Sequence, residues 1–471
     1  MTSVLDHIVK QEDAKLLTHQ ELNAIIQKSD VFPKDVPIKK DIGKLNLMCP
    51  SGSALLHKAA PLLQFYSDEG CPCDCGPNWT PEHILAAIKK GAHSSALHPE
   101  AAICLHKETQ EKIKGGYART VRVGDIKNCL PPSIKISPIA MIPHKSRKFR
   151  AILDLSYQLR LKGKKKPSVN SATNGKAPQK SMAELGQVLK RIIEIMAKNY
   201  DLNHPFLFSK CDIKDGFWRL KVNTEDAWNF CYVLPPTEKN TPIDDLLIVV
   251  PNSLQMGWCE SPPFFCAVSE TGRDVIQDLL HQEQSLPQHP MEHYVCGQDT
   301  PTYATHGHKT QDKITPVDLV EVYVDDFLGI TNNMDPTHLK HFGRALLHGI
   351  HSVFPPPTIT GHDGGDPISE KKMQQGDGQW AHIKEILGWE FNGKTSQSNS
   401  PKKKQSRYNA SSKQLPKETH LHSINFKSWQ EIYNMQLLES LGVKVYSHQS
   451  IKQCKGIQTK LSSPQHSNKH Y

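Results

Sequence analysis

The chain has 471 residues, 37% of them hydrophobic, so it is long enough to bury a sizeable core and to form roughly two to four domains or subdomains. Lys and Arg outnumber Asp and Glu by 57 to 48, and the net charge of +9 favours an anionic partner such as nucleic acid without requiring one. No apolar run approaches the roughly 20 residues that span a bilayer, and the N-terminus lacks a signal-peptide pattern. We expect a globular protein without a membrane partner, in the cytoplasm, an intracellular particle or the nucleus.

Helical patterns occupy the first part of the chain. Residues 1–60 show short helical patterns separated by polar breaks, as in "THQELNAIIQKSD", and carry no chemistry that the sequence reveals. Residues 61–210 begin with further helices, and Pro81 stands at the first-turn position that proline favours. After "LPPSIKISPIAMIPH" the pattern changes to short β-branched runs divided by prolines, which predicts strands.

The chain contains twelve cysteines, and three of them stand close together in "CPCDCGPNW". Without a signal peptide, reduced thiols are favoured over a disulfide framework. A structural zinc site needs two pairs of ligands with two to four residues between the members of each pair, and no second pair lies near Cys71, Cys73 and Cys75. We expect a turn-rich loop of free thiols, with a structural metal as the alternative.

The stretch "HKSRKFRAILDLS" gathers four cations in a loop that runs into an apolar strand. They are Lys145, Arg147, Lys148 and Arg150. Arginine offers a fork to phosphate oxygens and lysine a point charge, so the loop suits a triphosphate or a nucleic-acid backbone. The alternative is a solvated hairpin tip.

A carboxylate ends the strand-like run in "HPFLFSKCDIKDGFWRLKV". Asp212 stands at the end of this buried pattern, where a charge is unfavourable unless it binds a metal or another cation. Asp212 therefore needs a partner. Asp215 needs none, since Asp followed by Gly216 is ordinary turn chemistry.

A β-rich run passes through a glycine into a helix in "IVVPNSLQMGWCESPPFFCAVSETGRDVIQDLL". Gly257 allows the backbone to approach a ligand closely, and Ser261 with its two following prolines opens the helix. A polar, histidine-rich insert, residues 281–316, follows this helix. We expect this insert to lie on the surface.

Two adjacent aspartates interrupt the apolar stretch "VDLVEVYVDDFLGIT". Its halves predict a tight hairpin with Asp325 and Asp326 at the tip. If the strand that ends at Asp212 lies beside this hairpin, the carboxylates converge at one edge of a sheet. Such oxygen ligands suit Mg²⁺, and two such ions about 4 Å apart can promote phosphoryl transfer. Most Asp-Asp pairs are merely turns, but the apolar context and the upstream aspartate favour a metal site here.

Five motifs in succession resemble those of a known family. The order of "FRAILDLS", "CDIKDGF", "SLQMGWCESP", "YVDD" and "LGWEF" is similar to that of the reverse transcriptases of retroviruses and long-terminal-repeat retrotransposons. The resemblance covers roughly residues 130–395. It implies an α+β right-hand polymerase fold, with fingers within residues 61–210 and the palm in residues 211–395.

The resemblance also implies an RNA-directed DNA polymerase with two metal ions. Asp212, Asp325 and Asp326 match the catalytic carboxylates, which would hold two Mg²⁺ ions, or Mn²⁺, with the backbone carbonyl of Ile213 as a further contact. The implied partners are an RNA or DNA template with its primer and a deoxynucleoside triphosphate. The oligomeric state does not follow from the resemblance.

Further residues would bind the nucleotide and the primer. Phe217 resembles the aromatic gate that excludes a 2′-hydroxyl, with an ordinary core phenylalanine as the alternative. The other matched residues are Lys145, Arg147 and Arg150 of the fingers, Gly257 and Trp258 of the nucleotide pocket and template grip, and Leu387, Gly388 and Trp389 of the primer grip.

The chain departs from the family pattern inside the third motif and in the insert. The family commonly has Gln immediately before the glycine, whereas Met256 stands there and Gln255 precedes it. We therefore expect a backbone contact from this turn in place of a side-chain contact to the nucleotide. The histidine-rich insert is also longer than in retroviral enzymes.

The C-terminal tail lacks the long amphipathic pattern expected of a helical thumb. Residues 396–471 are basic and predicted to be poorly ordered. Synonymous codons in a shifted frame can spell a thumb-like sequence, so we interpret the tail as an out-of-frame thumb after a slip near residue 394. A disordered linker is the alternative, and the nucleotide sequence decides between them.

Two other functions remain open at the level of sequence. A catalytically inactive nucleic-acid-binding remnant is favoured by the missing thumb and opposed by the intact Asp212, Asp325 and Asp326. An RNA-dependent RNA polymerase shares the palm, but more often has Gly before the aspartate pair and lacks an aromatic gate at the place of Phe217.

Overall fold

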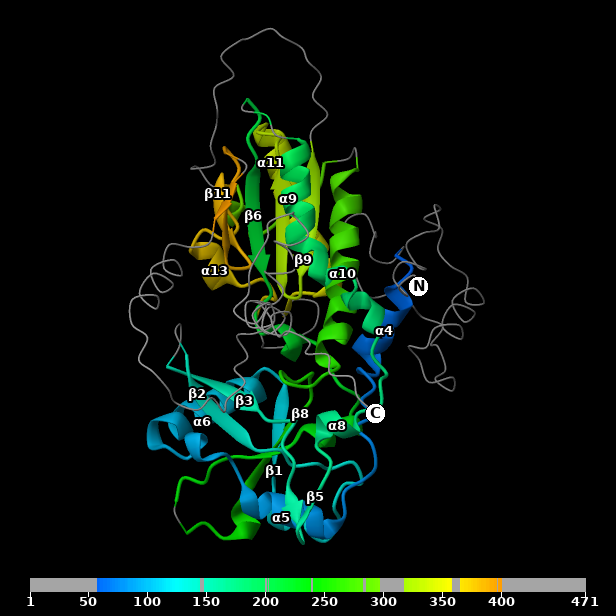
Figure 1. Ribbon diagram of the computed structural model, residues 1–471, viewed down its shortest axis with the longest axis vertical. Coiled ribbons are helices and arrows are strands. Elements are labelled where there is room, and N and C mark those ends of the chain that lie inside the picture. Colours follow the sequence, from blue (N-terminus) through cyan, green and yellow to red (C-terminus); the bar gives the residue numbers. More distant parts are fainter. Residues whose placement is uncertain are drawn as a thin grey trace, which may run out of the picture. The chain divides into compact units, whose positions relative to one another are not determined.

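The computed structural model describes residues 57–144, 148–199, 201, 203–238, 240–282, 285–296, 317–357, 365–395 and 397–399. The grey trace in Figure 1 marks the residues outside these ranges. Nearly all of the predicted region 1–60, most of the insert at 281–316 and nearly all of the tail at 396–471 lie outside the described residues, and so does the interpretation of the tail as an out-of-frame thumb.

Helices occur throughout the described ranges, and the two longest follow residue 260. The α-helices are α4 (Ala60–Asp68), α5 (Pro81–Lys90), α6 (Pro99–Lys114), α7 (Val123–Ile126), α8 (Val169–Ala172), α9 (Val188–Lys198), α10 (Ser261–Leu280), α11 (Pro336–Val353) and α13 (Glu370–Gln374). Short 3₁₀ turns are η1 (Ser94–Ala96), η2 (Gln179–Met182), η3 (Leu185–Gln187), η4 (Gly216–Arg219), η5 (Asp226–Phe230), η6 (Ile243–Asp245) and η7 (Glu292–Tyr294).

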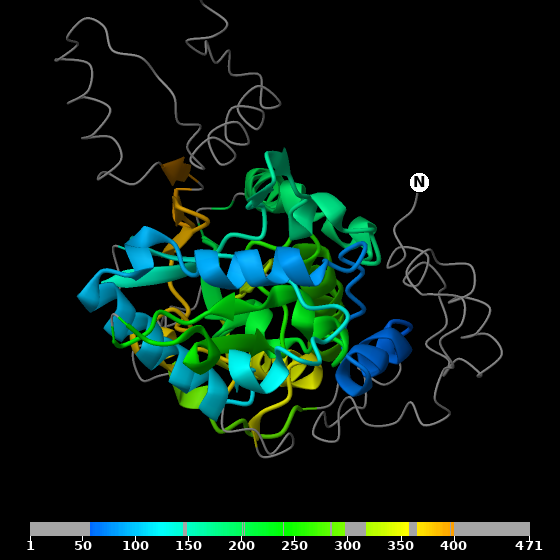
Figure 2. The same ribbon diagram turned by 90° about the horizontal axis from the view of Figure 1, so that it is seen from below.

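The described strands form small antiparallel sheets. The strands are β1 (Ala118–Arg122), β2 (Ile139–Pro143), β3 (Phe149–Leu153), β4 (Arg160–Leu161), β5 (Lys164–Lys165), β6 (Leu207–Asp212), β7 (Tyr232–Val233), β8 (Leu247–Pro251), β9 (Asp318–Tyr323), β10 (Asp326–Thr331), β11 (Ile383–Ile386), β12 (Trp389–Asn392) and β13 (Gln397–Asn399). They pair in the orders β1-β8-β7, β6-β10-β9, β11-β12-β13, β2-β3 and β4-β5. Helix α6 packs on β1 and β3 (Figure 2). The fold is therefore a mixture of helices and antiparallel sheet, as the predicted α+β class requires.

Local sequence signals place several of these elements. Thr80 caps α5 by accepting a hydrogen bond from the backbone N–H of His83, and Pro81 begins the helix as predicted. The predicted helix start at Ser261 is confirmed by α10. The hairpin expected around the aspartate pair is confirmed by β9 and β10.

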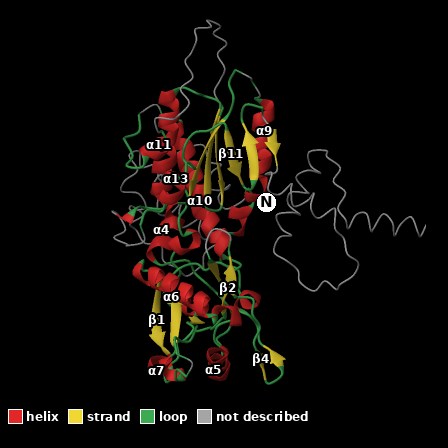
Figure 3. Ribbon diagram, turned by 90° about the vertical axis from the view of Figure 1, so that its left-hand side faces the viewer, coloured by secondary structure: helices red, strands yellow, loops and turns green. Residues whose placement is uncertain are grey.

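The β6-β10-β9 sheet packs against the long helices. Phe327 of β10 lies against α10, where a Cβ added to Gly272 would be 3.2 Å from the Phe327 ring and 2.9 Å from Val353 of α11. This close approach requires glycine at position 272. Figure 3 shows the helices and the sheet from the side. Strand β10 is buried on both faces after Asp326, so the polar residues of the sheet are placed at its end.

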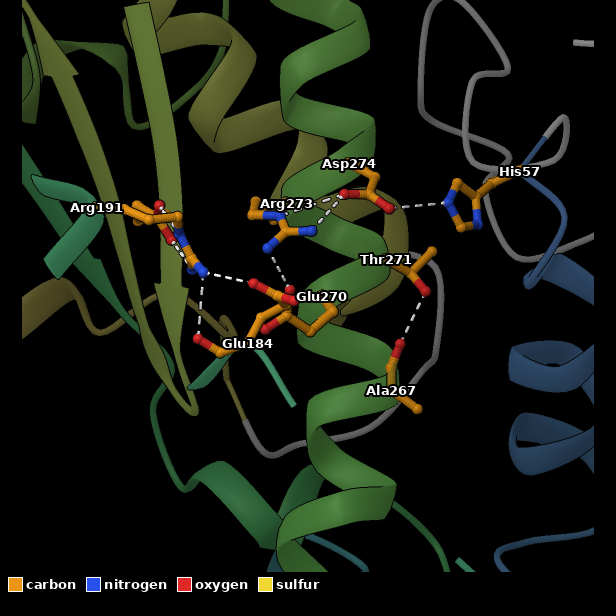
Figure 4. A network of polar contacts seen from close by, with 9 residues as sticks. His57, Glu184, Arg191, Ala267, Glu270, Thr271, Arg273 and Asp274 are labelled. Atoms are coloured by element: carbon orange, nitrogen blue, oxygen red, sulfur yellow. Dashed lines mark hydrogen bonds and ion pairs between the residues drawn. The ribbon is translucent and has the colours of Figure 1, made fainter. Parts of the chain in front are cut away.

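Charged side chains of α9, α10 and β9 lie close together and form what we call the α10 network (Figure 4). Arg191 of α9 donates two hydrogen bonds of 2.5 Å to Glu321 of β9, which is 2% exposed. Arg273 contacts Asp274 at 2.9 Å, and Asp274 accepts from His57 at 3.3 Å. The contact between Asp274 and His57 joins α10 to the segment before α4, and the contact between Arg191 and Glu321 joins α9 to the sheet.

One carboxylate in this network is poorly satisfied. Arg273 Nη1 lies 2.6 Å from Glu270 Oε2, yet neither oxygen of Glu270 accepts a hydrogen bond among the described residues. Burial raises the pKa of Glu270 to about 7, with Arg273 opposing and the charges of Asp274 and Glu321 adding to the shift. Glu270 is therefore about half protonated near pH 7.

The part of the insert that the structure describes combines exposed and buried residues. Within residues 285–296, Leu286, Met291 and Val295 are buried, and Glu292 pairs with Arg344 of α11 at 2.6 Å. Other residues of this segment, such as Ser285, Gln288 and His293, are exposed, so the predicted surface insert carries buried anchors here. Its composition is polar, but its few apolar side chains are spaced so that they reach the core.

The three clustered cysteines are buried and free. The thiol of Cys73 donates to the Cys71 carbonyl, and the backbone N–H of Cys73 donates to Asp226 Oδ2 at 2.8 Å. Burial raises the pKa of the Cys75 thiol to about 12. These thiols are therefore protonated and unreactive at neutral pH.

Among the described residues, no helix combines the length and the apolar character that a membrane span requires.

Candidate active site

The three predicted carboxylates meet at one end of the β6-β10-β9 sheet. Asp212 is the last residue of β6, Asp326 is the first of β10, and the two are direct partners in the antiparallel register. Direct partners project from the same face of a sheet. Asp325 lies in the turn before β10, and its carbonyl accepts a hydrogen bond of 2.9 Å from the N–H of Ile213. Residues more than a hundred positions apart are thus tied together by backbone bonds.

The turn that carries the aspartate pair is strained. Val324 and Asp325 connect β9 to β10, and Val324 has a φ of 56°. A β-branched residue rarely adopts this left-handed conformation, which favours glycine. Such strain is of order 1–3 kcal/mol and persists only where the surroundings enforce it. The side chain of Asp325 lies beside Gly216, where an added Cβ would be 3.7 Å from Asp325 Oδ2.

Burial and mutual repulsion disfavour the charged forms of these carboxylates. Asp212 is 9% exposed, and burial raises its pKa well above the usual range. The charges of Asp325 and Asp326 add to that shift. The pKa of Asp325 is also raised, first by burial and then by the charge of Asp326. The cluster therefore requires positive charge to be fully ionised.

Lys372 supplies part of that charge. Its ammonium group donates a hydrogen bond to Asp212 Oδ1 from α13. Burial lowers the pKa of Lys372, but the hydrogen bond and the charge of Asp212 outweigh this effect, so the pKa is raised overall. The raised pKa of Lys372 reflects its ion pair with Asp212. The pKa of Asp212 stays raised despite this pair, because one lysine does not neutralise three carboxylates.

The donor chemistry of this cluster suits a hard divalent cation. Three carboxylates and a backbone carbonyl are the oxygen ligands that Mg²⁺ prefers. Asp326 Oδ1 is buried without a hydrogen-bond partner among the described atoms, which leaves it available for a ligand. As they stand, however, no three His, Cys, Asp or Glu side chains of the described residues converge on one ion. The residues fit the cation chemically, and Asp212 would have to turn from Lys372 to bind it.

The segment after Asp212 is held by a distant part of the chain. Lys214 N donates to the Pro367 carbonyl at 2.7 Å, and Ser369 N donates to the Asp212 carbonyl at 2.8 Å. Between these two bonds, Ile213 forms an isolated antiparallel bridge with Ile368. The carbonyl of Ile213 is not the acceptor in either bond. The sequence analysis missed both the pairing of residues 212–214 with residues 367–369 and the role of Lys372. Nothing in the sequence around Lys371 and Lys372 indicates which distant residue they contact.

Phe217 lies in η4, just after the strand that ends at Asp212. Its ring is half-buried and packs edge-on against Phe265 of α10, with 5.4 Å between ring centroids. Asp215, for which no partner was expected, pairs with Lys112 at 2.6 Å and has a φ of 66°. The turn conformation at Asp215 agrees with the predicted Asp-Gly turn, and the fold adds a partner by bringing α6 beside it.

The predicted nucleotide-binding residues of β3 and of the glycine turn meet each other. Arg150 pairs with Ile142 in the β2-β3 hairpin, and its guanidinium donates to Met256 Sδ at 2.6 Å. Gly257 has a φ of 102°, and an added Cβ would be 3.0 Å from the Leu153 carbonyl. Only glycine fits there without strain. Met256 therefore lies beside Arg150.

Trp258 does not present its ring to a ligand. It is 1% exposed, its indole N–H donates to Thr173 at 3.1 Å, and its ring packs on Phe230 and Phe264. Any contact from Trp258 to a nucleotide would therefore come from the backbone.

Asn170 fixes the glycine turn from another part of the chain. Its Nδ2 donates to the Gly257 carbonyl at 2.8 Å, and its Oδ1 accepts from the N–H of Cys259 at 3.1 Å. Sequence analysis did not single out Asn170, because it lies 87 residues before Gly257 in an unremarkable helix start.

Leu387 and Gly388 form the two-residue turn of the β11-β12 hairpin, and Trp389 begins β12. Both turn residues have positive φ, 50° and 78°, as a type I′ turn requires. This sheet joins β6 near its start, where Phe208 bridges to Ala381. The structure therefore places the predicted primer-grip residues in a hairpin attached to the strand of Asp212. Lys145 and Arg147 lie outside the described residues.

No protein family and no curated protein sequence matches the chain. Among solved structures, the chain is similar at a low level to a foamy viral protease-reverse transcriptase in complex with double-stranded DNA, with 15% identity and a TM-score of 0.35. The match covers 96% of this chain and 62% of that chain, so this chain spans less than two thirds of the length of that protein.

Proposed function

We propose that this chain is a nucleotidyltransferase that extends a primer on an RNA or DNA template, an RNA-directed DNA polymerase. The observation that carries the proposal is the pairing of Asp212 with Asp326 at the end of one sheet, with Asp325 tied to Ile213 beside them. The order of the sequence motifs supports it. Residues 61–210 would include the fingers and residues 211–395 the palm.

The residues would share the work of one phosphoryl transfer. Two bound Mg²⁺ ions would supply activation of the primer 3′-hydroxyl and neutralisation of the leaving pyrophosphate. Asp212, Asp325 and Asp326 would hold them. Arg150, with Lys145 and Arg147, would bind the triphosphate oxygens. Such chemistry depends on positioning and electrostatics, and no covalent nucleophile is required.

Selection of the sugar would fall to Phe217. The ring is braced against Phe265 by an edge-on contact at 5.4 Å, so it cannot easily move away. A fixed aromatic ring beside the sugar would exclude a 2′-hydroxyl by steric conflict. Deoxynucleotides would then be favoured over ribonucleotides.

A second candidate is an inactive nucleic-acid-binding remnant of such a polymerase. The contact that favours it is the hydrogen bond of Lys372 to Asp212, because an ion pair that never opens would keep a cation from this carboxylate.

Primer extension separates the candidates. The full chain is tested on poly(rA)/oligo(dT) with Mg²⁺ or Mn²⁺, with dTTP or UTP, beside Asp325→Asn. We expect extension with dTTP and none with the variant. No extension above the background of the variant would contradict the active enzyme and favour the remnant. Equal use of UTP would contradict the gate at Phe217 and favour an RNA polymerase.

A further inference from the structure

We propose that Lys372 is an internal counter-ion of the carboxylate cluster: it occupies Asp212 when no divalent cation is bound and leaves Asp212 when one binds. This inference rests on the proposed function, and it assigns a regulatory role to a residue outside the sequence motifs. In this role Lys372 lowers the affinity for the cation and stabilises the metal-free protein.

The position of Lys372 is set by the backbone. Lys372 N donates to the Ser369 carbonyl at 2.9 Å, and Ser369 N donates to the Asp212 carbonyl at 2.8 Å. The first turn of α13 is thus hydrogen-bonded to the residue that its lysine neutralises. The lysine side chain is 41% exposed and that of Asp212 is 11% exposed, so the ammonium group reaches the carboxylate from the solvent side.

The segment that carries Lys372 is anchored independently of the ion pair. Asp366 Oδ1 accepts from His351 of α11 at 3.0 Å and from the N–H of Ile368 at 2.8 Å. Arg219 donates to the Asp366 carbonyl at 2.9 Å. Because these bonds hold the segment in place, the lysine side chain can swing away while the backbone stays where it is.

The two occupants exclude each other on physical grounds. The ammonium group of Lys372 offers only donors, and it uses the Asp212 oxygen that a cation would need. A divalent cation beside it would also meet a like charge. Displacement is feasible because a half-exposed lysine regains water when it leaves. The orphaned Asp326 Oδ1 marks the part of the cluster that Lys372 does not neutralise.

Mn²⁺ binding to the full chain, followed by the electron paramagnetic resonance signal of the free ion, tests the proposal. The variants are Lys372→Met, Lys372→Arg and the control Lys371→Met, which removes the same charge from the exposed neighbouring residue of α13. We expect Lys372→Met to bind Mn²⁺ about tenfold more tightly or more, because a charge-assisted hydrogen bond no longer competes. Lys372→Arg should stay near the wild type, and Lys371→Met should change far less.

Thermal unfolding gives a second readout that does not depend on activity. Lys372→Met should unfold at a lower temperature than the wild type without metal, and saturating Mn²⁺ should remove the difference. If Lys372→Met does not fold, Lys372→Gln takes its place in both measurements.

The outcomes separate this inference from the proposed function. Equal Mn²⁺ affinity of wild type and Lys372→Met, with binding lost in Asp326→Asn, would overturn the counter-ion and leave the proposed function intact. Failure of every variant to bind Mn²⁺ would overturn both. A gain in Lys371→Met equal to that in Lys372→Met would also overturn the counter-ion, because the effect would then be one of net charge alone.

Discussion

Two buried groups of carboxylates in this protein are neutralised in different ways. In the α10 network, Glu321 accepts two hydrogen bonds from Arg191, and Asp274 forms an ion pair with Arg273. At the sheet end, three carboxylates share Lys372, and one oxygen of Asp326 has no partner among the described atoms. The first group is largely neutralised by the protein itself, as a structural network must be. The second is left with excess negative charge, which is what a cation site requires.

Removal of a cation from the α10 network should have the largest effect on stability. Arg191→Ala would leave Glu321, which is 2% exposed, without its bidentate partner. We expect a loss of about 3–5 kcal/mol in the free energy of unfolding, because an unpaired charge would remain buried. Urea denaturation measures it. The double variant Arg191→Met/Glu321→Leu should recover most of the loss, and a failure to do so would show that packing, not charge, is lost.

Glu270 should make the stability of the fold depend on pH. Its pKa is raised from 4.5 to about 7, so the folded state binds its proton more strongly than the unfolded chain. The resulting stabilisation is complete below the unfolded value and is lost as pH rises through about 7. Glu270→Gln should therefore gain up to about 3 kcal/mol relative to wild type between pH 4.5 and pH 8.

Denaturation of both proteins across this pH range measures the difference. The control is the comparison at pH 4.5, where the wild-type carboxyl is already neutral and the two proteins should be nearly equal. A difference that does not change with pH would mean that Glu270 is neutralised by Arg273 as fully as Glu321 is by Arg191.

Loss of a charge at the sheet end should stabilise the metal-free protein, whereas loss of Arg191 destabilises it. Asp325→Asn removes repulsion from Asp326, and the pKa of Asp325 is raised by burial and by that neighbour. We expect the metal-free protein to gain on the order of 1 kcal/mol at pH 8, while primer extension is lost. Denaturation without metal is the measurement. Destabilisation by this variant would mean that the cluster is as well neutralised as the α10 network.

The strained turn offers the smallest expected change. Val324→Gly relieves a φ of 56° at a residue that carries no charge. We expect a gain of less than about 1 kcal/mol in stability, because the greater freedom of glycine in the unfolded chain offsets part of the relief. Val324→Ala, which keeps a Cβ, is the matched control and should gain less. A loss of stability in Val324→Gly would indicate that packing of the valine side chain stabilises the protein by more than the strained backbone destabilises it.

Sequence patterns by themselves determined the local elements and their carboxylates. The strand that ends at Asp212, the hairpin of Asp325 and Asp326, and the start of α10 follow from apolar alternation, turn residues and proline positions. These signals are local, because they depend on neighbours within one element. The motif order also predicted that the three carboxylates belong together.

Only the tertiary structure decided which distant groups complete the site. Lys372 reaches Asp212 across 160 positions and Asn170 holds Gly257 across 87, and in neither case does one stretch of sequence mark the other. The burial of Trp258 and of Leu286, Met291 and Val295 was likewise invisible, since polar composition does not show which few side chains reach a core. Local periodicity places residues on an element, but a partner is chosen by the packing of one element on another.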